Sequence, residues 1–234
     1  MNNIDRITTI SFDGDMTLWD FNKVMQHSLA ITLEELRRQL PGKSTSELTI
    51  EKMIATRNEV AKELEDKTIN LEEIRLQAFK RTLDAVGYED DQLAIRLNNL
   101  YLKHRFEDIE LYSDVLPTLN ELRKDYRLGL ISNGNGYPER CGLPDFFSFV
   151  IFSQDVGIKK PNPEIFSMAC KKANCLNTEL LHIGDSLESD VQGANAAGVL
   201  SVWLNRDGLA KSSKIQPAFE IQSLNEISEI LKYK

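Results

Sequence analysis

The sequence predicts an α/β fold, a doubly wound parallel sheet with an inserted bundle of four helices. Two observations support this prediction. Short β-branched apolar runs alternate with helical patterns over residues 110–234, which is typical of a parallel sheet flanked by helices. Residues from about 19 to 109 contain helical patterns and no strand pattern. We therefore expect a core made of residues 1–18 and 110–234, and a helical domain made of residues 19–109.

Five segments have the composition of buried parallel strands, which are nearly all apolar and often β-branched. They are residues 7–12, 127–131, 149–152, 180–183 and 200–204. Helices are predicted between the later strands. Asp114 can cap the first helix and Pro163 can open the second. The third is predicted from Glu188 to Ala197, where small residues allow close packing on the sheet.

The inserted segment is recognised by apolar residues at helical spacing. Its four patterns begin at Leu29, Ile50, Leu76 and Leu93, and Gly87 ends the third of them. Four helices joined by short turns form a small bundle. Because the bundle follows the first strand, we expect it to be a cap over the crevice at the end of the sheet.

Composition excludes several classes of function. The chain has 41% hydrophobic and 27% charged residues, which is ordinary for a globular protein, and a net charge of −8, which argues against nucleic-acid binding. No apolar run reaches the ~18 residues of a membrane span, and no signal segment begins the chain. We therefore expect a cytoplasmic protein. The three cysteines form no CxxC pair and are expected to be reduced.

Four polar clusters follow the predicted strands and indicate the function. They are Asp13-Gly14-Asp15-Met16-Thr17, Ser132-Asn133-Gly134, Lys160-Pro161, and Gly184-Asp185-Ser186 followed by Asp190. The carboxyl ends of parallel strands meet in one crevice, whatever their separation along the chain. The clusters therefore predict one site that contains carboxylates, an ammonium group, a hydroxyl group and backbone N–H groups. Such a set suits a divalent cation and a phosphate.

The residue types in these clusters predict phosphoryl chemistry. Asp13 and Asp15 stand two residues apart, so both can project into the site, and paired carboxylates allow one member to be ionised while the other carries a proton. Lys160 can neutralise phosphoryl oxygens, and Asp185 can bind Mg²⁺. Asp190 has two interpretations: a carboxylate favoured at a helix N-terminus, or a group that binds the metal, holds a metal-bound water or orients Lys160.

Together, and in this order, the clusters resemble the motifs of the haloacid dehalogenase superfamily, in its phosphatase branch with a helical cap. The resemblance covers the whole core. It implies a Rossmann-like core and Mg²⁺-dependent hydrolysis of a small phosphorylated metabolite through an aspartyl phosphate. It also implies a role for each residue. Asp13 would be the nucleophile, and Asp15 the general acid and then the general base. The phosphate ligands would be Ser132, Asn133 and Lys160, the metal ligands Asp13, Asp15 (through its carbonyl) and Asp185, and the supporting residues Thr17 and Asp190.

Other functions within the superfamily leave different signatures. Dehalogenases and phosphonate-cleaving members lack the second acid, which is Asp15 here. A sugar phosphomutase resembles proteins with a His about ten residues past that acid, where this chain has Met25, with His27 nearby. A non-catalytic binding protein would be favoured by loss of a charged motif residue, and none is lost. Gly14 and Met16 depart from the family pattern, which commonly has an apolar residue and Gly there.

Substrate choice is expected to depend on the helical domain. Arg57, Arg75 and Lys80 can reach a substrate or remain surface ion-pair partners. Trp19 and Phe21 can line the site or pack at the hinge. The sequence does not distinguish a nucleotide from a sugar phosphate or an organic acid phosphate, and it specifies no oligomeric state.

Overall fold

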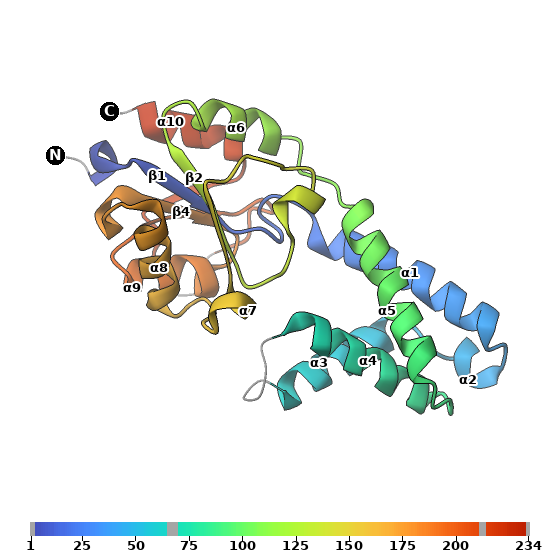
Figure 1. The fold of residues 1–234 in the computed structure, drawn as a ribbon. Coiled ribbons are helices and arrows are strands. Elements are labelled where there is room, and N and C mark those ends of the chain that lie inside the picture. The colour runs from blue at the N-terminus through green and yellow to red at the C-terminus, as the bar shows by residue number, and fades with distance from the viewer. Residues whose placement is uncertain (1–2, 65–69, 211–213, 233–234) are drawn as a thin grey trace. The chain divides into compact units, whose positions relative to one another are not determined.

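The chain forms two compact units (Figure 1). The computed structural model describes residues 3–64, 70–210 and 214–232. One unit consists of Met1–Asp20 and Glu110–Lys234, and the other of Phe21–Ile109. Trp19, assigned to the helical domain from the sequence, belongs to the first unit because it forms β-bridges with Asp15 and Leu111. The bridge from Trp19 to Leu111 joins the segment that enters the helical unit to the segment that leaves it.

The first unit is built on a parallel sheet in the order β3-β2-β1-β4-β5-β6. Its strands are β1 (Thr9–Phe12), β2 (Arg127–Ser132), β3 (Phe149–Phe152), β4 (Leu180–Gly184), β5 (Leu200–Leu204) and β6 (Phe219–Ile221). All five predicted strands are present, and β6 was not predicted. The fully buried β1 pairs with β2 on one side and with β4 on the other. The strand order therefore reverses at β1, and a crevice opens at its carboxyl end.

Helices pack on both faces of this sheet (Figure 1). Helices α6 (Val115–Leu122) and α10 (Ile227–Lys232) lie on one face, and α8 (Pro163–Ala173) and α9 (Gly193–Ala196) lie on the other. The shorter helical segments are η1 (Asn3–Arg6), η2 (Pro138–Arg140), α7 (Ser153–Val156), η3 (Asn177–Glu179) and η5 (Leu224–Glu226). The doubly wound α/β architecture predicted from the sequence is confirmed.

Two helix predictions need correction. The third predicted helix divides into a π-helical segment, η4 (Leu187–Gln192), and α9. A π-turn places an additional residue in the turn and is frequent at functional sites. Asp114 stands at the N-cap of α6 as predicted, but its side chain makes no capping hydrogen bond. Its carboxylate instead accepts hydrogen bonds from Arg206, from the Ser223 hydroxyl group and from the Leu224 N–H.

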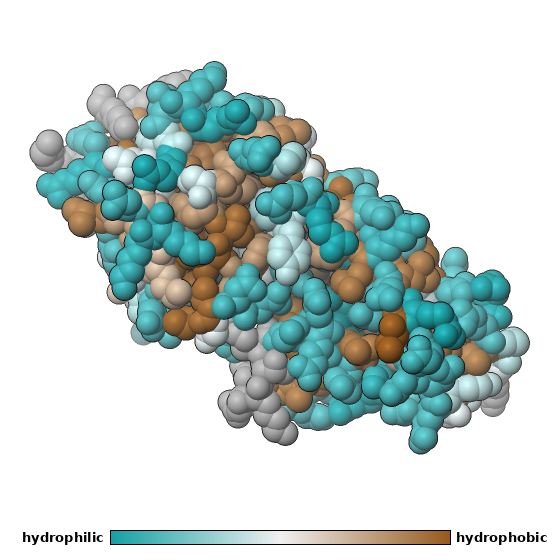
Figure 2. Space-filling model, viewed as in Figure 1, coloured by the Kyte–Doolittle hydropathy of each residue, from teal (hydrophilic) through white to brown (hydrophobic). Residues whose placement is uncertain are grey.

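The second unit contains the four predicted helices and one short additional helix. They are α1 (Phe21–Gln39), α2 (Lys43–Ser46), α3 (Ile50–Glu63), α4 (Leu71–Ala85) and α5 (Asp91–Glu107). Thr49, Asn70 and Asp90 cap the last three of these helices through their side chains. Leucines and aromatic residues at helical spacing form a buried core, and the visible surface of the unit is largely hydrophilic (Figure 2). No helix in the described part of the chain is long and apolar enough to span a bilayer.

Candidate active site

The polar clusters meet at the carboxyl end of the sheet. Asp13 directly follows β1, Ser132 ends β2, and Asp185 directly follows β4. Lys160 comes from the loop between α7 and α8, and Asp190 from η4. Because β1 lies between β2 and β4, these residues converge at the carboxyl ends of three neighbouring strands.

Lys160 lies at the centre of the cluster. Its side chain is almost fully buried, and its Nζ donates hydrogen bonds to Asp13 Oδ1 at 2.6 Å, to Asp190 Oδ1 at 2.6 Å and to the Ile131 carbonyl at 2.8 Å. Burial lowers the pKa of Lys160, but the two carboxylates outweigh this effect and leave the pKa above its ordinary value. The ammonium group is therefore charged and points at the acid that follows β1.

Asp190 is fixed by several donors. Its Oδ1 accepts hydrogen bonds from Lys160 and from His182 Nε2, and its Oδ2 accepts one from the Ser186 N–H at 3.0 Å. Burial raises the pKa of Asp190, but Lys160 and His182 lower it below its ordinary value. Gly184 leaves room for this carboxylate, because a Cβ on that residue would collide with it. The contacts favour the interpretation of Asp190 as the residue that orients Lys160.

His182 was not identified from the sequence, because it lies within a strand that otherwise appears to be core. Its ring is fully buried in β4, where Nδ1 lies 2.8 Å from the Ser11 hydroxyl group and Nε2 lies 3.1 Å from Asp190 Oδ1. Burial lowers the pKa of His182, so the ring is neutral near pH 7. A carboxylate can only accept hydrogen bonds, so Nε2 carries the proton and donates it to Asp190.

The carboxylates form a site that fits a divalent cation. Asp13, Asp185 and Asp190 each offer an oxygen, and these oxygens lie within 4.8 Å of one another. Burial, opposed by Lys160, raises the pKa of Asp13 well above its ordinary value, and burial together with Asp190 raises the pKa of Asp185 to about 6. A cation here would offset this crowding of negative charge, and oxygen ligands suit Mg²⁺. Asp13 and Asp185 are the better candidates, because both Asp190 oxygens already accept hydrogen bonds.

Asp15 is oriented by a residue whose contact with it was not predicted. Trp19 is fully buried, and its indole N–H donates a hydrogen bond to Asp15 Oδ1 at 2.7 Å. The other oxygen, Oδ2, lies over Gly134, where an added Cβ would come within 2.5 Å of it. Met16 has a φ of 64°, which permits the tight turn that places these groups after β1.

The loop after β2 offers donors beside this acid. The Ser132 hydroxyl group accepts a hydrogen bond from the Gly134 N–H at 3.0 Å, so its own hydrogen can be donated elsewhere. The Asn133 side chain holds the backbone of Lys160, donating to its carbonyl at 2.9 Å and accepting from its N–H at 2.8 Å. This clamp was not predicted. Thr17 Oγ1 lies 3.4 Å from Asp185 Oδ1.

The candidate residues of the helical unit have different surroundings. Lys80 forms an ion pair with Asp91 at 2.9 Å, and His27 bonds to Asp108 at 3.1 Å. Arg57 and Arg75, by contrast, both line a pocket within this unit, together with Phe21.

Comparison with known proteins identifies similar chains. Residues 7–198 match the family model of the haloacid dehalogenase-like hydrolases. The chain is 27% identical to the glyceraldehyde 3-phosphate phosphatase of Methanopyrus kandleri, covering 97% of both chains, and 26% identical to the human N-acylneuraminate-9-phosphatase, covering 98% and 95%. Among solved structures, a 2-haloacid dehalogenase from Pseudomonas syringae pv. Tomato superposes with a TM-score of 0.84 at 30% identity, over 97% of this chain and 99% of that one.

Proposed function

Because the chain belongs to the haloacid dehalogenase-like hydrolases, we propose that it is a Mg²⁺-dependent cytoplasmic phosphatase of a small phosphorylated metabolite. The observation that carries this proposal is the contact between Lys160 and Asp13 at 2.6 Å beside a second acid, Asp15. The similar phosphatases named above also support it. Those two enzymes are named for different esters, so neither name is transferred as the substrate.

In the proposed reaction Asp13 attacks the phosphorus of the ester. The Ser132 hydroxyl group and the Asn133 N–H donate hydrogen bonds to the phosphoryl oxygens, and the charge of the Lys160 ammonium group stabilises them. Asp15 gives its proton to the departing alcohol oxygen, and an aspartyl phosphate remains on Asp13. Asp15, now ionised, removes a proton from water, whose oxygen attacks the same phosphorus and regenerates Asp13 with release of phosphate.

The metal would be held by Asp13, Asp185 and the backbone carbonyl of Asp15. When bound, Mg²⁺ would neutralise charge on the phosphoryl oxygens and favour the ionised form of the nucleophile. Asp190 is a positioning residue in this scheme, since it acts through Lys160. Thr17 supports Asp185 through its hydroxyl group.

Three alternatives differ from this proposal in what they require of the same residues. A dehalogenase, suggested by the solved structure described above, needs a nucleophile but no acid to protonate a leaving alcohol, so the ordered Asp15 favours ester hydrolysis. A phosphomutase would return the phosphoryl group to a second hydroxyl group instead of water. A non-catalytic binding protein would need none of the charged set.

The test is phosphate release from a panel of phosphorylated metabolites with Mg²⁺. Wild type is compared with Asp13→Asn, with Asp15→Asn and with an EDTA control. We expect release to vanish in all three. With 4-nitrophenyl phosphate, whose leaving group needs no proton, Asp15→Asn should accumulate a phosphoryl group on Asp13, detected by mass spectrometry. Halide release from 2-chloropropionate is measured in parallel. Halide release without phosphate release would replace the proposal with a dehalogenase, and neither release, with the fold intact, would favour a binding protein or a mutase.

A further inference from the structure

The helical unit contains a pocket of its own. Its volume is about 290 Å³, and it lies between α1, α3, α4 and α5. Aromatic and aliphatic side chains form most of its wall, including Phe21, Met25, Met53, Phe79 and Tyr101. Every lining residue belongs to residues 21–109, so the pocket is a property of this unit alone.

The pocket is positively charged although the chain carries a net charge of −8. Among the described residues, its lining includes Arg57 and Arg75 but no Asp or Glu. A third guanidinium group, that of the buried Arg105, lies 4.6 Å above the Phe21 ring that forms part of the wall. Positive charge is therefore concentrated at this pocket in an otherwise acidic protein, and such a pocket favours an anionic ligand.

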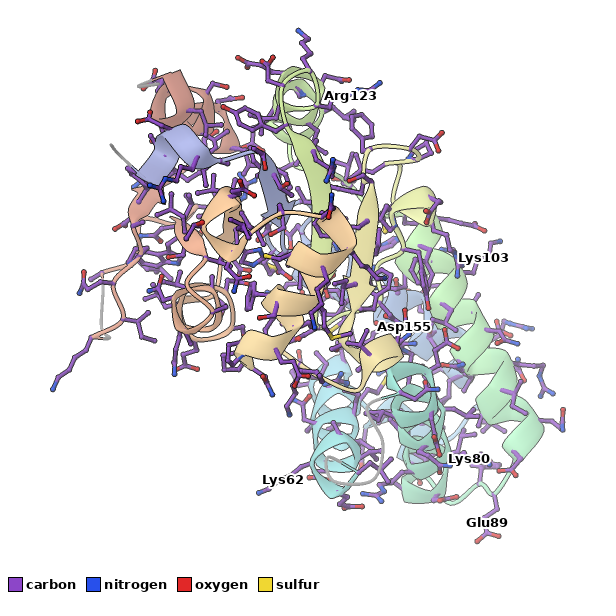
Figure 3. All side chains as sticks on the ribbon, turned by 60° about the vertical axis from the view of Figure 1, so that its left-hand side comes forward. Lys62, Lys80, Glu89, Lys103, Arg123 and Asp155 are labelled. Carbon is purple, nitrogen blue, oxygen red and sulfur yellow. The ribbon has the colours of Figure 1, made fainter. Side chains whose placement is uncertain are left out.

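Arg75 forms no ion pair with any of the described residues, although burial lowers its pKa and the nearby Tyr101 and Glu72 offset part of this effect. Its guanidinium group packs 5.3 Å from the centroid of the Tyr101 ring, and its Nη1 is buried without a hydrogen-bond partner in the described part of the chain. A buried charged donor without an acceptor is costly, so native proteins usually provide a partner. Two lysines of the unit, Lys62 and Lys103, instead extend outward from the helices (Figure 3).

We propose that this pocket binds a small organic anion, with Arg75 as the counter-ion of its carboxylate or phosphate group and the aromatic side chains packed against its apolar part. A guanidinium group is suited to this task because its planar donors match the oxygens of either group. Asn58, which also lines the pocket, offers an amide group that can orient the ligand, whereas the Thr82 hydroxyl group donates to the Ala78 carbonyl.

This anion has two possible sources. It can be a second acidic group on the alcohol part of the substrate, in which case the substrate is a phosphate ester that carries another anionic group. It can also be a separate small molecule. Binding itself does not rest on the proposed phosphatase activity; only the assignment of the anion to the substrate does.

The first experiment measures binding to the full chain by calorimetry in EDTA. The probes are 2-naphthoate and 2-naphthamide, which has nearly the same shape without the charge. Arg75→Met removes the guanidinium group, and Arg75→Lys keeps the charge without the planar donors. Arg96→Met is the matched control, because this exposed arginine of α5 is not part of the pocket.

We expect wild type and Arg96→Met to bind naphthoate at least about tenfold more tightly than naphthamide, and Arg75→Met to lose this preference. We also expect Arg75→Met to melt at or above the temperature of wild type, because the variant removes a buried donor without an acceptor. If Arg75→Met does not fold, Arg75→Lys carries the binding comparison, and its preference for naphthoate should be weaker than that of wild type because the planar donors are lost. Failure of wild type to prefer the carboxylate, or unchanged preference in the Arg75 variants, would overturn the proposal.

The second experiment assigns the source of the anion. Hydrolysis of phenyl phosphate is compared with that of 4-carboxyphenyl phosphate. The anion is assigned to the substrate if Arg75→Met lowers kcat/KM by about tenfold or more for 4-carboxyphenyl phosphate and leaves kcat/KM for phenyl phosphate unchanged. Equal kcat/KM values in wild type and variant, with naphthoate binding lost, assign it to a separate ligand. Absence of hydrolysis from both esters would count against the proposed function and leave the binding result intact.

Discussion

Replacing Lys160 by Met should destabilise the first unit strongly, independently of catalysis. The Nζ group neutralises two acids in a site where Lys160 is 3% exposed and Asp190 is 1% exposed. The Met side chain has similar length but no charge, so Lys160→Met leaves Asp13 and Asp190 as neighbouring buried carboxylates and removes a donor from the Ile131 carbonyl. Removing one partner of a buried ion pair costs about 3–5 kcal/mol, and we expect a loss of this size at pH 7 in EDTA.

A double-mutant cycle tests the reasoning more sharply than the single variant. Asp190→Asn alone should cost about 1–3 kcal/mol, since Lys160 keeps Asp13 as its partner. In the double variant Lys160→Met/Asp190→Asn the repulsion between the two acids is absent. Its loss of unfolding free energy should therefore be smaller than the sum of the two single-variant losses by about 1–3 kcal/mol. Lys159→Met, at the exposed neighbouring position, is the control and should change stability by less than about 0.5 kcal/mol.

Urea unfolding followed by tryptophan fluorescence is the appropriate assay. The chain has two tryptophans, Trp19 and Trp203, and both belong to the first unit, so the signal reports on the unit that contains the site. Midpoints are converted to free energies with the measured slope of each variant. Additive losses in the cycle, or a loss below about 1 kcal/mol for Lys160→Met, would refute the view that Lys160 neutralises a buried pair of acids.

Three further predictions concern other contacts. Burial raises the pKa of Asp114, but hydrogen bonds from Arg206 and two other donors lower it below 3.8, so the ionised carboxylate stabilises the fold above that pH and this stabilisation is lost below it. Asp114→Asn should therefore lower the free energy of unfolding by about 1–3 kcal/mol at pH 7 and by progressively less below about pH 4. An equal loss at pH 7 and below pH 4 would contradict this prediction. Trp19→Phe removes the donor that orients Asp15 and should lower kcat about tenfold with little change in KM, measured by steady-state phosphate release. Mg²⁺ at about 100 times its Kd should stabilise wild type by about 2.7 kcal/mol in thermal unfolding, and Asp185→Asn should abolish most of this effect.

The strands and the clusters after them could be predicted because each depends on a short, continuous piece of sequence. A run such as residues 7–12 has enough β-branched residues to indicate a strand, and polar residues after it must lie at the carboxyl end of the sheet. The three residues of β6 contain a Glu and give no such signal. Its position depends on pairing with β5, which composition does not encode.

Contacts that depend on the folded backbone account for what was missed at the site. His182 has the burial of a core residue, and only the fold reveals that its ring nitrogens face Ser11 and Asp190. The indole of Trp19 could be predicted as buried, but its hydrogen bond to Asp15 depends on the turn between them. The pocket around Arg75 requires four helices to be packed, so the sequence could only offer this residue among several cations.

The central position of β1 has a consequence for the order of events during synthesis. Its neighbours begin at residues 127 and 180, so the strand emerges from the ribosome long before either partner exists. At ~5–20 residues per second this delay lasts several seconds, and the helical unit is completed within it. The carboxylates directly after β1 then act against misassociation, because charged residues beside a hydrophobic strand discourage aggregation. In the released fragment of residues 1–126, protease protection should therefore cover residues 21–109 and not β1; protection of β1 in that fragment would contradict this order.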